Sequence, residues 1–450
     1  MRRIVVTSVA VLSLAAAALG AVVAEREPLD IRVFAPIGPP GQPEPVAIGP
    51  DRRVYVGTNQ LGHGDTDAPS KVFAFSRKGE PVREYVIEGQ PLDESHGIQG
   101  LVFDRDGTLY ALDRSADPRV IAVDPATGDQ RRYASFRDVP SCGTAPGSDG
   151  EECSDTRLDG PAGPDYATFA PDGDLYVTDI DQALIWRVPK GGGRAEIWLT
   201  DARLESLYGP NGIQFMADER TLLFVNTASN PSAGNALTGR LYTVVVQDDG
   251  SPGELTQVWE SLPVDAPDGI AIAQSGNVYV AVAGSSQVLK LSPEFTELAR
   301  VPPDPAANQS EEIPVDAPGS LAFLGERLLV SNHSAIRGDP ESWAILDVFA
   351  GERGLPLHYP RIARPRLFVA VRARRAEAGD HVRLRVRVTR HLASLDSPVR
   401  GGRVRARRQR ARTDRDGVAR LRLATAPGAA ITVRARKRGF VRAKRPIAAP

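Results

Sequence analysis

The sequence predicts an all-β protein: a six-bladed β-propeller over residues 28–360, followed by a small, basic, antiparallel β-sandwich over residues 366–446. Three observations support this prediction. A two-strand unit recurs six times before residue 360, apolar and charged residues alternate after it, and the balance of charge reverses there. A chain of 450 residues is long enough for one large domain and one small one.

Each recurring unit is a short apolar strand, a tight polar turn and a second strand rich in Val, Leu and Tyr. The units read PEPVAIGPDRRVYVGT from Pro43, IQGLVFDRDGTLYALD from Ile98, PDYATFAPDGDLYVTD from Pro164, PNGIQFMADERTLLFVN from Pro210, PDGIAIAQSGNVYVAV from Pro267 and PGSLAFLGERLLVSN from Pro318. The residues that open them are Glu44, Gln99, Asp165, Asn211, Asp268 and Gly319, spaced 46 to 66 residues apart. This spacing suits four-stranded propeller blades with unequal loops.

A third strand follows every unit, and a fourth follows the first five. The third strands begin at Lys71, Arg119, Leu184, Arg240, Gln287 and Trp343. Since the last unit has no fourth strand of its own, we expect IRVFAPIG from Ile31 to complete it and to close the ring. A parallel β-helix is the competing fold, but its rungs are shorter and more uniform, and it does not need a hairpin in every repeat.

The first 24 residues indicate export. Arg2 and Arg3 precede an apolar run, and Val22-Val23-Ala24 fits a signal-peptidase site. The apolar run is also long enough for an uncleaved N-terminal anchor. In both cases the rest of the chain is expected outside the cytoplasm, either secreted or held at the membrane.

The two cysteines, Cys142 and Cys153, lie close together in a Gly/Ser/Asp-rich stretch. In an oxidising compartment such a pair predicts a disulfide that fixes one loop. A metal site would need further soft ligands nearby, and the stretch has none.

Charge divides the chain into two parts. Residues 361–450 contain 27 Lys+Arg and 5 Asp+Glu, which leaves 28 and 51 of the chain's 55 and 56 for residues 1–360. The formal charges are therefore +22 and −23, although the whole chain carries only −1. Arginine is preferred over lysine throughout, but that preference does not explain why the acids avoid the C-terminal part.

In the C-terminal part, HVRLRVRV from His381, GVARLRL from Gly417 and ITVRARKRGF from Ile431 alternate with period two, as half-buried strands do. The segment from TDRDGVARLRL to ITVRARKRGF resembles bacterial Ig-like or carboxypeptidase-regulatory-like domains, which share a fold without sharing a function. A basic sheet face suits an anionic cell-envelope polymer, the acidic propeller, or solvent alone. With Phe368 and Phe440 as its only aromatics, it predicts no nucleic-acid partner.

The residues that open the units should surround one mouth of the propeller channel. Three carboxylates and two amides that converge there repel one another unless a cation or water satisfies them. Oxygen ligands without a convergent His or Cys favour a hard cation, Ca²⁺ before Mg²⁺ or Mn²⁺. Polar residues at these positions also simply cap the channel in many propellers. The longer connections, such as 137–163, lie at the same end, where function usually resides.

The units GPNGIQF around Asn211 and APDGIAIAQSGNVYVA around Asp268, together with PEPVAI around Glu44, resemble the SMP-30/gluconolactonase/LRE-like family of six-bladed propellers, over roughly residues 28–355. That resemblance implies a divalent metal, usually Ca²⁺, held by Glu44, Asn211 and Asp268, with Asp165 as a fourth ligand or partner. The spelling Pro43-Glu44-Pro45 departs from the lactonase pattern and is closer to NHL-like and strictosidine-synthase-like propellers.

The same resemblance implies hydrolysis of a small-molecule lactone or ester. The metal would polarise the carbonyl group, and Asp268, or else His96, would take the proton from water. Gln99 and Gly319 leave one side of the site open, where we expect Gln99 to contact substrate. A non-catalytic binding propeller with a structural metal is the main alternative, and a Pictet-Spengler-type condensation would need a catalytic Glu that the sequence does not identify.

Overall fold

The computed structural model describes residues 26–60, 64–140, 153, 160–229, 238–263, 265–309, 311–362, 367–376, 381–392, 395–437, 440 and 442–450. Strands dominate these residues, and the predicted all-β class is confirmed. The proposed leader, residues 1–24, and Cys142 lie outside them. Within the described residues, no helix is long and apolar enough to cross a membrane.

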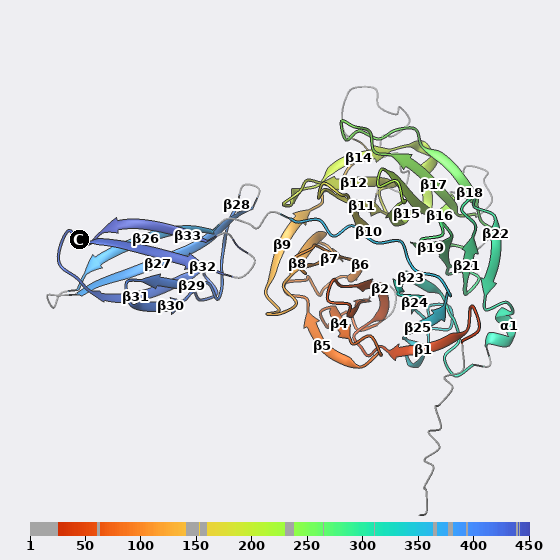
Figure 1. Cartoon of the computed structure of the whole chain (residues 1–450), viewed down its shortest axis with the longest axis horizontal. Helices are drawn as coiled ribbons and strands as arrows, with labels where there is room; N and C mark the ends of the chain where they lie inside the picture. Colours follow the sequence, from red (N-terminus) through yellow and green to blue (C-terminus); the bar gives the residue numbers. More distant parts are fainter. Residues whose placement is uncertain are drawn as a thin grey trace, which may run out of the picture.

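Most of the chain before residue 350 forms antiparallel four-stranded meanders around a common centre, the arrangement of a β-propeller (Figure 1). In chain order the meanders are β2 (Gln42–Ile48), β3 (Val54–Asn59), β4 (Lys71–Phe75), β5 (Pro81–Val86); β6 (Gly97–Phe103), β7 (Leu109–Arg114), β8 (Arg119–Val123), β9 (Gln130–Ser135); β10 (Pro164–Phe169), β11 (Leu175–Asp179), β12 (Leu184–Val188), β14 (Glu196–Thr200); β15 (Ser206–Phe215), β16 (Thr221–Ser229), β17 (Arg240–Val245), β18 (Thr256–Glu260); β19 (Pro267–Ile272), β20 (Val278–Val282), β21 (Gln287–Leu291), β22 (Glu297–Val301); and β23 (Pro318–Leu324), β24 (Arg327–Asn332), β25 (Ala344–Phe349). The predicted third strands are all present at their expected places.

The strand at Ile31 supplies the missing edge of the last meander. β1 (Ile31–Pro36) pairs antiparallel with β25, so that residues more than 300 positions apart share one sheet. The pair Asn59–Gly97 joins the first two meanders, and the short β13 (Gly193–Arg194) adds a ninth strand at the edge of this sheet, parallel to β9. Short helical turns lie in the connections: α1 (Pro305–Asn308) and the 3₁₀ turns Ala202–Leu204 and Pro340–Ser342.

The core of the propeller lies between neighbouring sheets. Trp186 of β12, which is fully buried, belongs to one apolar cluster with Tyr110 of β7 and Phe169 of β10. A comparable cluster joins β1, β2 and β3 to β24 and β25. Because each sheet buries both faces against its neighbours, its strands are more continuously apolar than those of a sheet with one wet face.

After β25 the chain crosses the channel as a strap, residues 352–362 (Figure 1). The strap forms an isolated bridge between Ala273 and Gly354, and further on the Tyr359 hydroxyl donates a 2.9 Å hydrogen bond to the Ile48 carbonyl. Ile362 then packs in the cluster around β7 to β12. The strap thus spans the mouth of the channel at the turn end of the innermost strands.

The C-terminal module, residues 367–450, consists of two antiparallel sheets that share one hydrophobic cluster. The first sheet contains β26 (Leu367–Arg375), β27 (His381–Leu392), β28 (Leu395–Pro398) and β31 (Val418–Ala424). The second contains β29 (Arg403–Ala406), β30 (Gln409–Arg412), β32 (Ala430–Arg436) and β33 (Ala443–Ala448). Val382, Leu384, Val386 and Val388 are buried, while the arginines between them are exposed, as the period-two alternation predicts.

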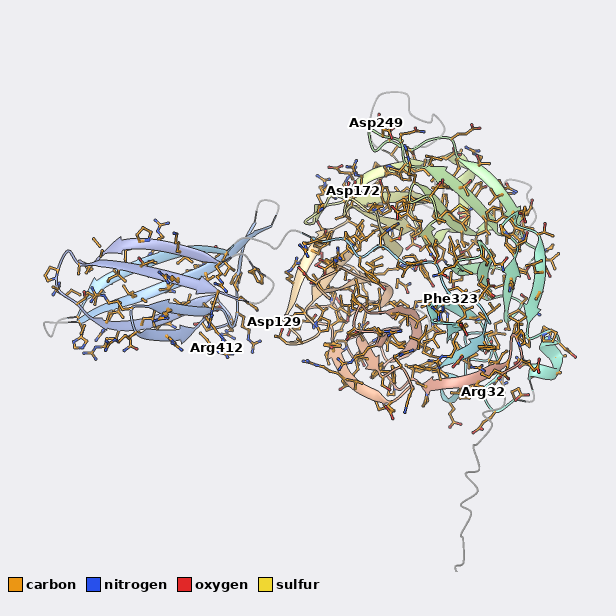
Figure 2. All side chains as sticks on the ribbon, viewed as in Figure 1. Arg32, Asp129, Asp172, Asp249, Phe323 and Arg412 are labelled. Atoms are coloured by element: carbon orange, nitrogen blue, oxygen red, sulfur yellow. The ribbon has the colours of Figure 1, made fainter. Side chains whose placement is uncertain are left out.

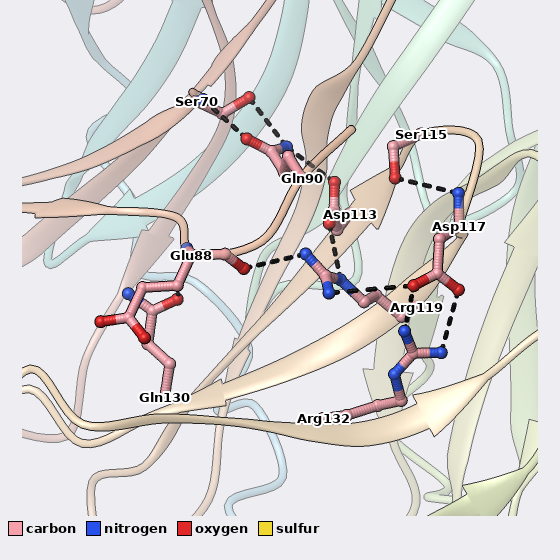
Figure 3. A network of polar contacts seen from close by, with 9 residues as sticks. All are labelled: Ser70, Glu88, Gln90, Asp113, Ser115, Asp117, Arg119, Gln130 and Arg132. Carbon is pink, nitrogen blue, oxygen red and sulfur yellow. Dashed lines mark hydrogen bonds and ion pairs between the residues drawn. The ribbon is translucent and has the colours of Figure 1, made fainter. Parts of the chain in front are cut away.

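Buried polar residues at the ends of the second strands of the meanders fix the connecting loops at the end of the channel that carries Glu44. Asp113 of β7 is fully buried and accepts hydrogen bonds from Arg119 Nε at 2.8 Å and Gln90 Nε2 at 2.7 Å (Figure 3). Gln90 in turn accepts from the Ser70 amide, and Arg119 donates to the Glu88 carbonyl. One carboxylate therefore orders three separate stretches of loop.

We expect Asp113→Ala to lower the free energy of unfolding by about 3–5 kcal/mol, because it removes the buried carboxylate that bonds Arg119 at 2.8 Å and leaves Arg119 only the half-exposed Asp117 at 3.9 Å. Urea unfolding measures this loss. Asp117→Ala is the matched control: Asp117 is about half exposed, and removal of exposed ion pairs costs about 1 kcal/mol or less. Equal losses for the two variants would contradict the role assigned to Asp113.

Glu352, at the start of the strap, has a depressed pKa. Burial opposes ionisation, but hydrogen bonds from Lys290, Ser275, Tyr279 and Asn277 outweigh it and lower the pKa of Glu352 to about 2. The Lys290 Nζ atom lies 2.7 Å from Glu352 Oε1, and the Tyr279 hydroxyl donates to the same oxygen at 2.6 Å. Several blade residues thus converge on this carboxylate where the strap begins.

Since the folded-state pKa of Glu352 lies below its ordinary value, the charge stabilises the fold above about pH 4.5 and loses its effect as the pH falls toward 2. We expect Glu352→Gln to lose about 1 kcal/mol at pH 7, after allowance for solvent screening. The difference from wild type should shrink between pH 5 and 3 in urea titrations. Glu27→Gln, at an exposed glutamate, is the control, and a difference that stays constant with pH would contradict the assignment.

Candidate metal centre

The innermost strands approach one another most closely at the residues that open them. A Cβ added at Gly100 would lie 2.7 Å from the Asp165 carbonyl oxygen, one at Gly212 2.6 Å from that of Asp268, and one at Gly269 2.5 Å from that of Gly319. Only glycine fits these contacts. The close approach explains why a glycine follows Gln99, Asn211 and Asp268 directly, and it brings the preceding polar side chains to the channel axis.

Every innermost strand also has an irregular register at this point. The shifts lie between Pro43 and Val46, Ile98 and Gly100, Pro164 and Ala167, Pro210 and Ile213, Pro267 and Ile270, and Pro318 and Leu321. A β-bulge breaks the two-residue alternation and redirects side chains. Two consecutive residues, Asp165 and Tyr166, can therefore both be directed to the site.

Three side chains form the centre of the site. One ligand atom each from Glu44, Asp268 and His333 lies within 4.8 Å of the others. Glu44 and His333 are buried and Asp268 is half-buried. This is the only group of three or more His, Cys, Asp or Glu side chains with such geometry among the described residues.

His333 reaches the centre because the sixth innermost strand opens with a glycine. A Cβ at Gly319 would lie 2.1 Å from His333 Nε2 and 3.2 Å from Glu44 Oε1. The imidazole thus occupies the place that a side chain at position 319 would take. His333 Nε2 lies 3.0 Å from Glu44 Oε2, at ion-pair distance but without hydrogen-bond geometry.

Further residues surround Glu44. The Tyr166 hydroxyl donates to Glu44 Oε1 at 3.4 Å, and Asn59 Nδ2 donates to Oε2 at 3.3 Å. Asp165 is buried nearby and is subject to the negative charges of both Asp268 and Glu44. Asn211 Nδ2 donates to the Thr227 hydroxyl at 3.0 Å, which leaves its carbonyl oxygen for another partner.

In this cluster, burial and the neighbouring negative charges disfavour the ionised forms of the carboxylates, and a bound cation would offset both effects. Burial, followed by the charge of Glu44, raises the pKa of Asp268. Burial, followed by the charges of Asp268 and Glu44, raises that of Asp165 well above its usual range. For His333, burial disfavours the charged ring, but the carboxylates of Glu44 and Asp268 outweigh this and raise its pKa.

Three oxygens of the predicted ring are buried without a hydrogen-bond partner among the described residues: Asp268 Oδ1, Asn211 Oδ1 and Gln99 Oε1. Unsatisfied buried acceptors are costly, and a cation or bound water would relieve them. The donor set therefore fits a divalent metal. The carboxylate and amide oxygens suit Ca²⁺ or Mn²⁺, whereas the ring nitrogen of His333 suits transition metals such as Zn²⁺.

The structure separates the predicted site residues into two groups. Glu44, Asp268 and Asp165 interact electrostatically, and the strand that carries Asn211 lies against the backbone of Asp268. His96 has a different place: its Nδ1 lies 2.9 Å from the Glu94 carbonyl oxygen and its Nε2 3.0 Å from that of Ala68. Both ring nitrogens face the backbone, so these contacts hold loops together and do not support a role as base.

Neither Tyr166 nor His333 stands out from the sequence as a residue of the site. Tyr166 lies next to Asp165, and strict alternation would direct it away from the site. The glycine at position 319 was the available signal for His333, because it is the one gap in an otherwise polar ring. Cys153 is disulfide-bonded, whereas Cys142, the only other cysteine of the chain, lies outside the described residues.

A cavity of about 410 Å³ occupies the channel between the cluster and the strap. Its lining includes Tyr166 and Ser320 near the cluster, Phe103 and Phe169 from the innermost strands, and Arg353–Tyr359 from the strap. The lining is mostly apolar, with Tyr166 and Ser320 at the end near the cluster and Arg353 and His358 on the strap.

Comparisons with known proteins agree with this scaffold. The model of the SMP-30/Gluconolactonase/LRE-like region matches residues 199–329, a segment that contains Asn211, Asp268 and Gly319. No functionally curated protein sequence matches the chain. The structure of regucalcin from Agrobacterium tumefaciens, described as a calcium-binding protein, is 18% identical and superimposes with a TM-score of 0.50 over 74% of this chain and 98% of its own.

Two further solved structures are more distant. A gluconolactonase from Xanthomonas campestris is 15% identical, with a TM-score of 0.46 over 70% of this chain and 87% of its own. Virginiamycin B lyase from Staphylococcus aureus is 14% identical, with a TM-score of 0.45 over 71% and 99%. At these identities the likeness to regucalcin shows a shared fold, and residues 199–329 are similar to the SMP-30/Gluconolactonase/LRE-like region.

Gly319→Ala tests whether His333 belongs to the centre. The added methyl group must displace His333 or Glu44, so we expect affinity for divalent metal to fall roughly tenfold or more, as when groups around a metal are disturbed. Isothermal titration with Ca²⁺, Mn²⁺ and Zn²⁺ measures this, alongside the thermal unfolding midpoint. The control is Gly38→Ala, where an added Cβ meets nothing within 4 Å. Unchanged affinity in Gly319→Ala would remove His333 from the site.

Proposed function

We propose that this chain is an exported, divalent-metal-dependent hydrolase of the lactonase or esterase type. In this proposal the scaffold is a six-bladed propeller closed by β1, followed by an Ig-like sandwich module. The observation that carries it is the convergence of Glu44, Asp268 and His333 beside buried oxygens that have no hydrogen-bond partner in the described part of the chain. Similarity of residues 199–329 to the SMP-30/Gluconolactonase/LRE-like region supports the choice of reaction.

Each residue has a chemical role in this proposal. Glu44, Asn211 and Asp268 hold the metal, with Asp165 or His333 completing the set, and Ca²⁺ remains the first candidate because most donors are oxygens. When bound, the metal supplies Lewis acidity toward a carbonyl group and acidifies water. Tyr166 donates to Glu44 and so fixes its orientation.

Proton transfer falls to Asp268 in preference to His96. Asp268 belongs to the cluster, where its carboxylate would take the proton from water, whereas both ring nitrogens of His96 face backbone carbonyl oxygens. Gln99, whose carbonyl oxygen has no partner among the described residues, is our candidate for contact with substrate. The small-molecule ester or lactone would approach from the face that carries the long loops.

Two features of the chain support the proposal that it is exported. The N-terminal segment has the composition of a secretion signal, cleaved after Ala24 or kept as an anchor. The disulfide at Cys153 fits an oxidising compartment outside the cytoplasm.

A non-catalytic binding propeller is the second candidate. It is favoured by burial: the side chains of Glu44 and His333 are only 7% and 8% exposed, which leaves little surface for a substrate. In that case the metal would neutralise the ring of carboxylates and stabilise the fold.

A hydrolysis screen separates the two candidates. We expect the wild-type chain to hydrolyse members of a panel of aliphatic lactones and aryl esters, to lose activity in EDTA and to regain it with Ca²⁺ or Mn²⁺. Asp268→Asn should reduce the rate by about 10² or more, the scale of a general base. Initial rates with each substrate measure this.

Asp104→Asn is the matched control, because Asp104 is a buried carboxylate in the β6–β7 turn and bonds Tyr110 rather than the cluster. Its activity should stay within a few-fold of wild type. Metal binding without hydrolysis of any substrate would overturn the enzyme and favour the binding propeller.

A further inference from the structure

The C-terminal module carries arginines that face one another across its first sheet. The register pairs Arg372 with Arg385 and Arg385 with Arg420, so that these three form one row across β26, β27 and β31. Arg374, Arg383 and Arg422 form the next row in the same way. All six side chains are exposed.

The second sheet repeats the pattern. Arg412, Arg403 and Arg436 form one row across β30, β29 and β32. The adjacent row is Arg410, Arg405, Arg434 and Lys444, which extends to β33. These side chains are exposed as well, so the module has basic rows on the outer faces of both sheets.

Such rows oppose folding. Like charges directly opposite one another on a sheet destabilise it, because neighbouring strands are only about 4.8 Å apart. Among the described residues, Asp414 is the only acid that pairs with any of these basic side chains, through Arg420 at 3.2 Å. A merely soluble surface would intersperse both signs of charge. The rows are therefore better explained by an anionic partner that relieves the repulsion.

The acidic propeller of the same chain does not fill this role. The described ion pair between the two parts joins Lys437 Nζ to Asp129 Oδ2 at 3.0 Å, and Figure 2 shows Asp129 at the propeller edge next to the module. The rows stay exposed although the propeller of the same chain carries many carboxylates. Their partner should therefore bind guanidinium groups better than scattered surface carboxylates do.

We propose that the arginine rows bind a linear polymer of the cell envelope whose backbone carries repeating phosphodiester groups. Guanidinium groups bind phosphate oxygens in pairs, and arginine does this better than lysine. Within a row the strands that carry the arginines are about 4.8 Å apart, and successive rows are about 7 Å apart along the strands, so an extended polyanion can meet one charge after another. Nucleic acid is disfavoured, because Phe440 packs against the core and none of the positions paired within the rows is aromatic.

Binding of the full exported chain to a soluble poly(glycerol phosphate) tests the proposal. We expect Arg372→Gln/Arg385→Gln/Arg420→Gln to weaken binding roughly tenfold or more at physiological salt. The slope of log affinity against log salt should fall by about 2, since each lost contact on a flexible polyanion contributes about 0.7. The row Arg403→Gln/Arg412→Gln/Arg436→Gln should act similarly, and Arg372→Lys/Arg385→Lys/Arg420→Lys should be intermediate.

The matched control is Arg77→Gln/Arg105→Gln/Arg361→Gln, which removes three exposed charges from the propeller and its strap. It should bind within twofold of wild type. Equal weakening by the control would reduce the effect to net charge and overturn the proposal. Tighter binding of single-stranded DNA of equal phosphate number would also overturn it, as would salt-sensitive self-association without polymer binding, which would make the partner a second copy of the propeller.

Discussion

The close approach of the innermost strands at the channel axis is the constraint on which the rest of the propeller depends. Backbones that come this near leave no room even for a Cβ, which fixes glycine after Gln99, Asn211 and Asp268. The residues before those glycines must then be directed toward the axis, and each strand has a bulge there. Packing and site are thus produced by the same local geometry.

That geometry also explains why the site is electrostatically costly. Glu44, Asp165 and Asp268 are brought together in a space with little water, where burial and mutual repulsion disfavour their ionised forms. Asn59, Tyr166 and His333 relieve Glu44, and the charge of His333 also favours the ionised form of Asp268, but burial and repulsion still raise the pKa of Asp268. A protein keeps such a cluster where it gains something from it, and a bound cation is the simplest gain.

Much of this arrangement could be predicted from the sequence. Alternation, hairpin turns and the spacing of the units predict the strands and the positions of Glu44, Asn211 and Asp268, because these depend on local patterns. His333 could not be placed in the same way, since it reaches the axis only through the gap at Gly319. Tyr166 could not be placed either, because the bulge reverses its expected direction. The strap has no periodic pattern, and its contacts join residues as distant as Ile48 and Tyr359.

The segregation of charge connects the two parts of the chain. A propeller with an excess of carboxylates repels anions from its surface, so its site should select neutral or cationic small molecules over acidic ones. The module has the opposite preference and presents its arginines on outer faces that the propeller leaves free. If the module holds an anionic polymer, the positive charge of the module attracts the polymer, and the negative charge of the propeller keeps it away from the channel. Attachment and access to the site can then operate together without competing for one ligand.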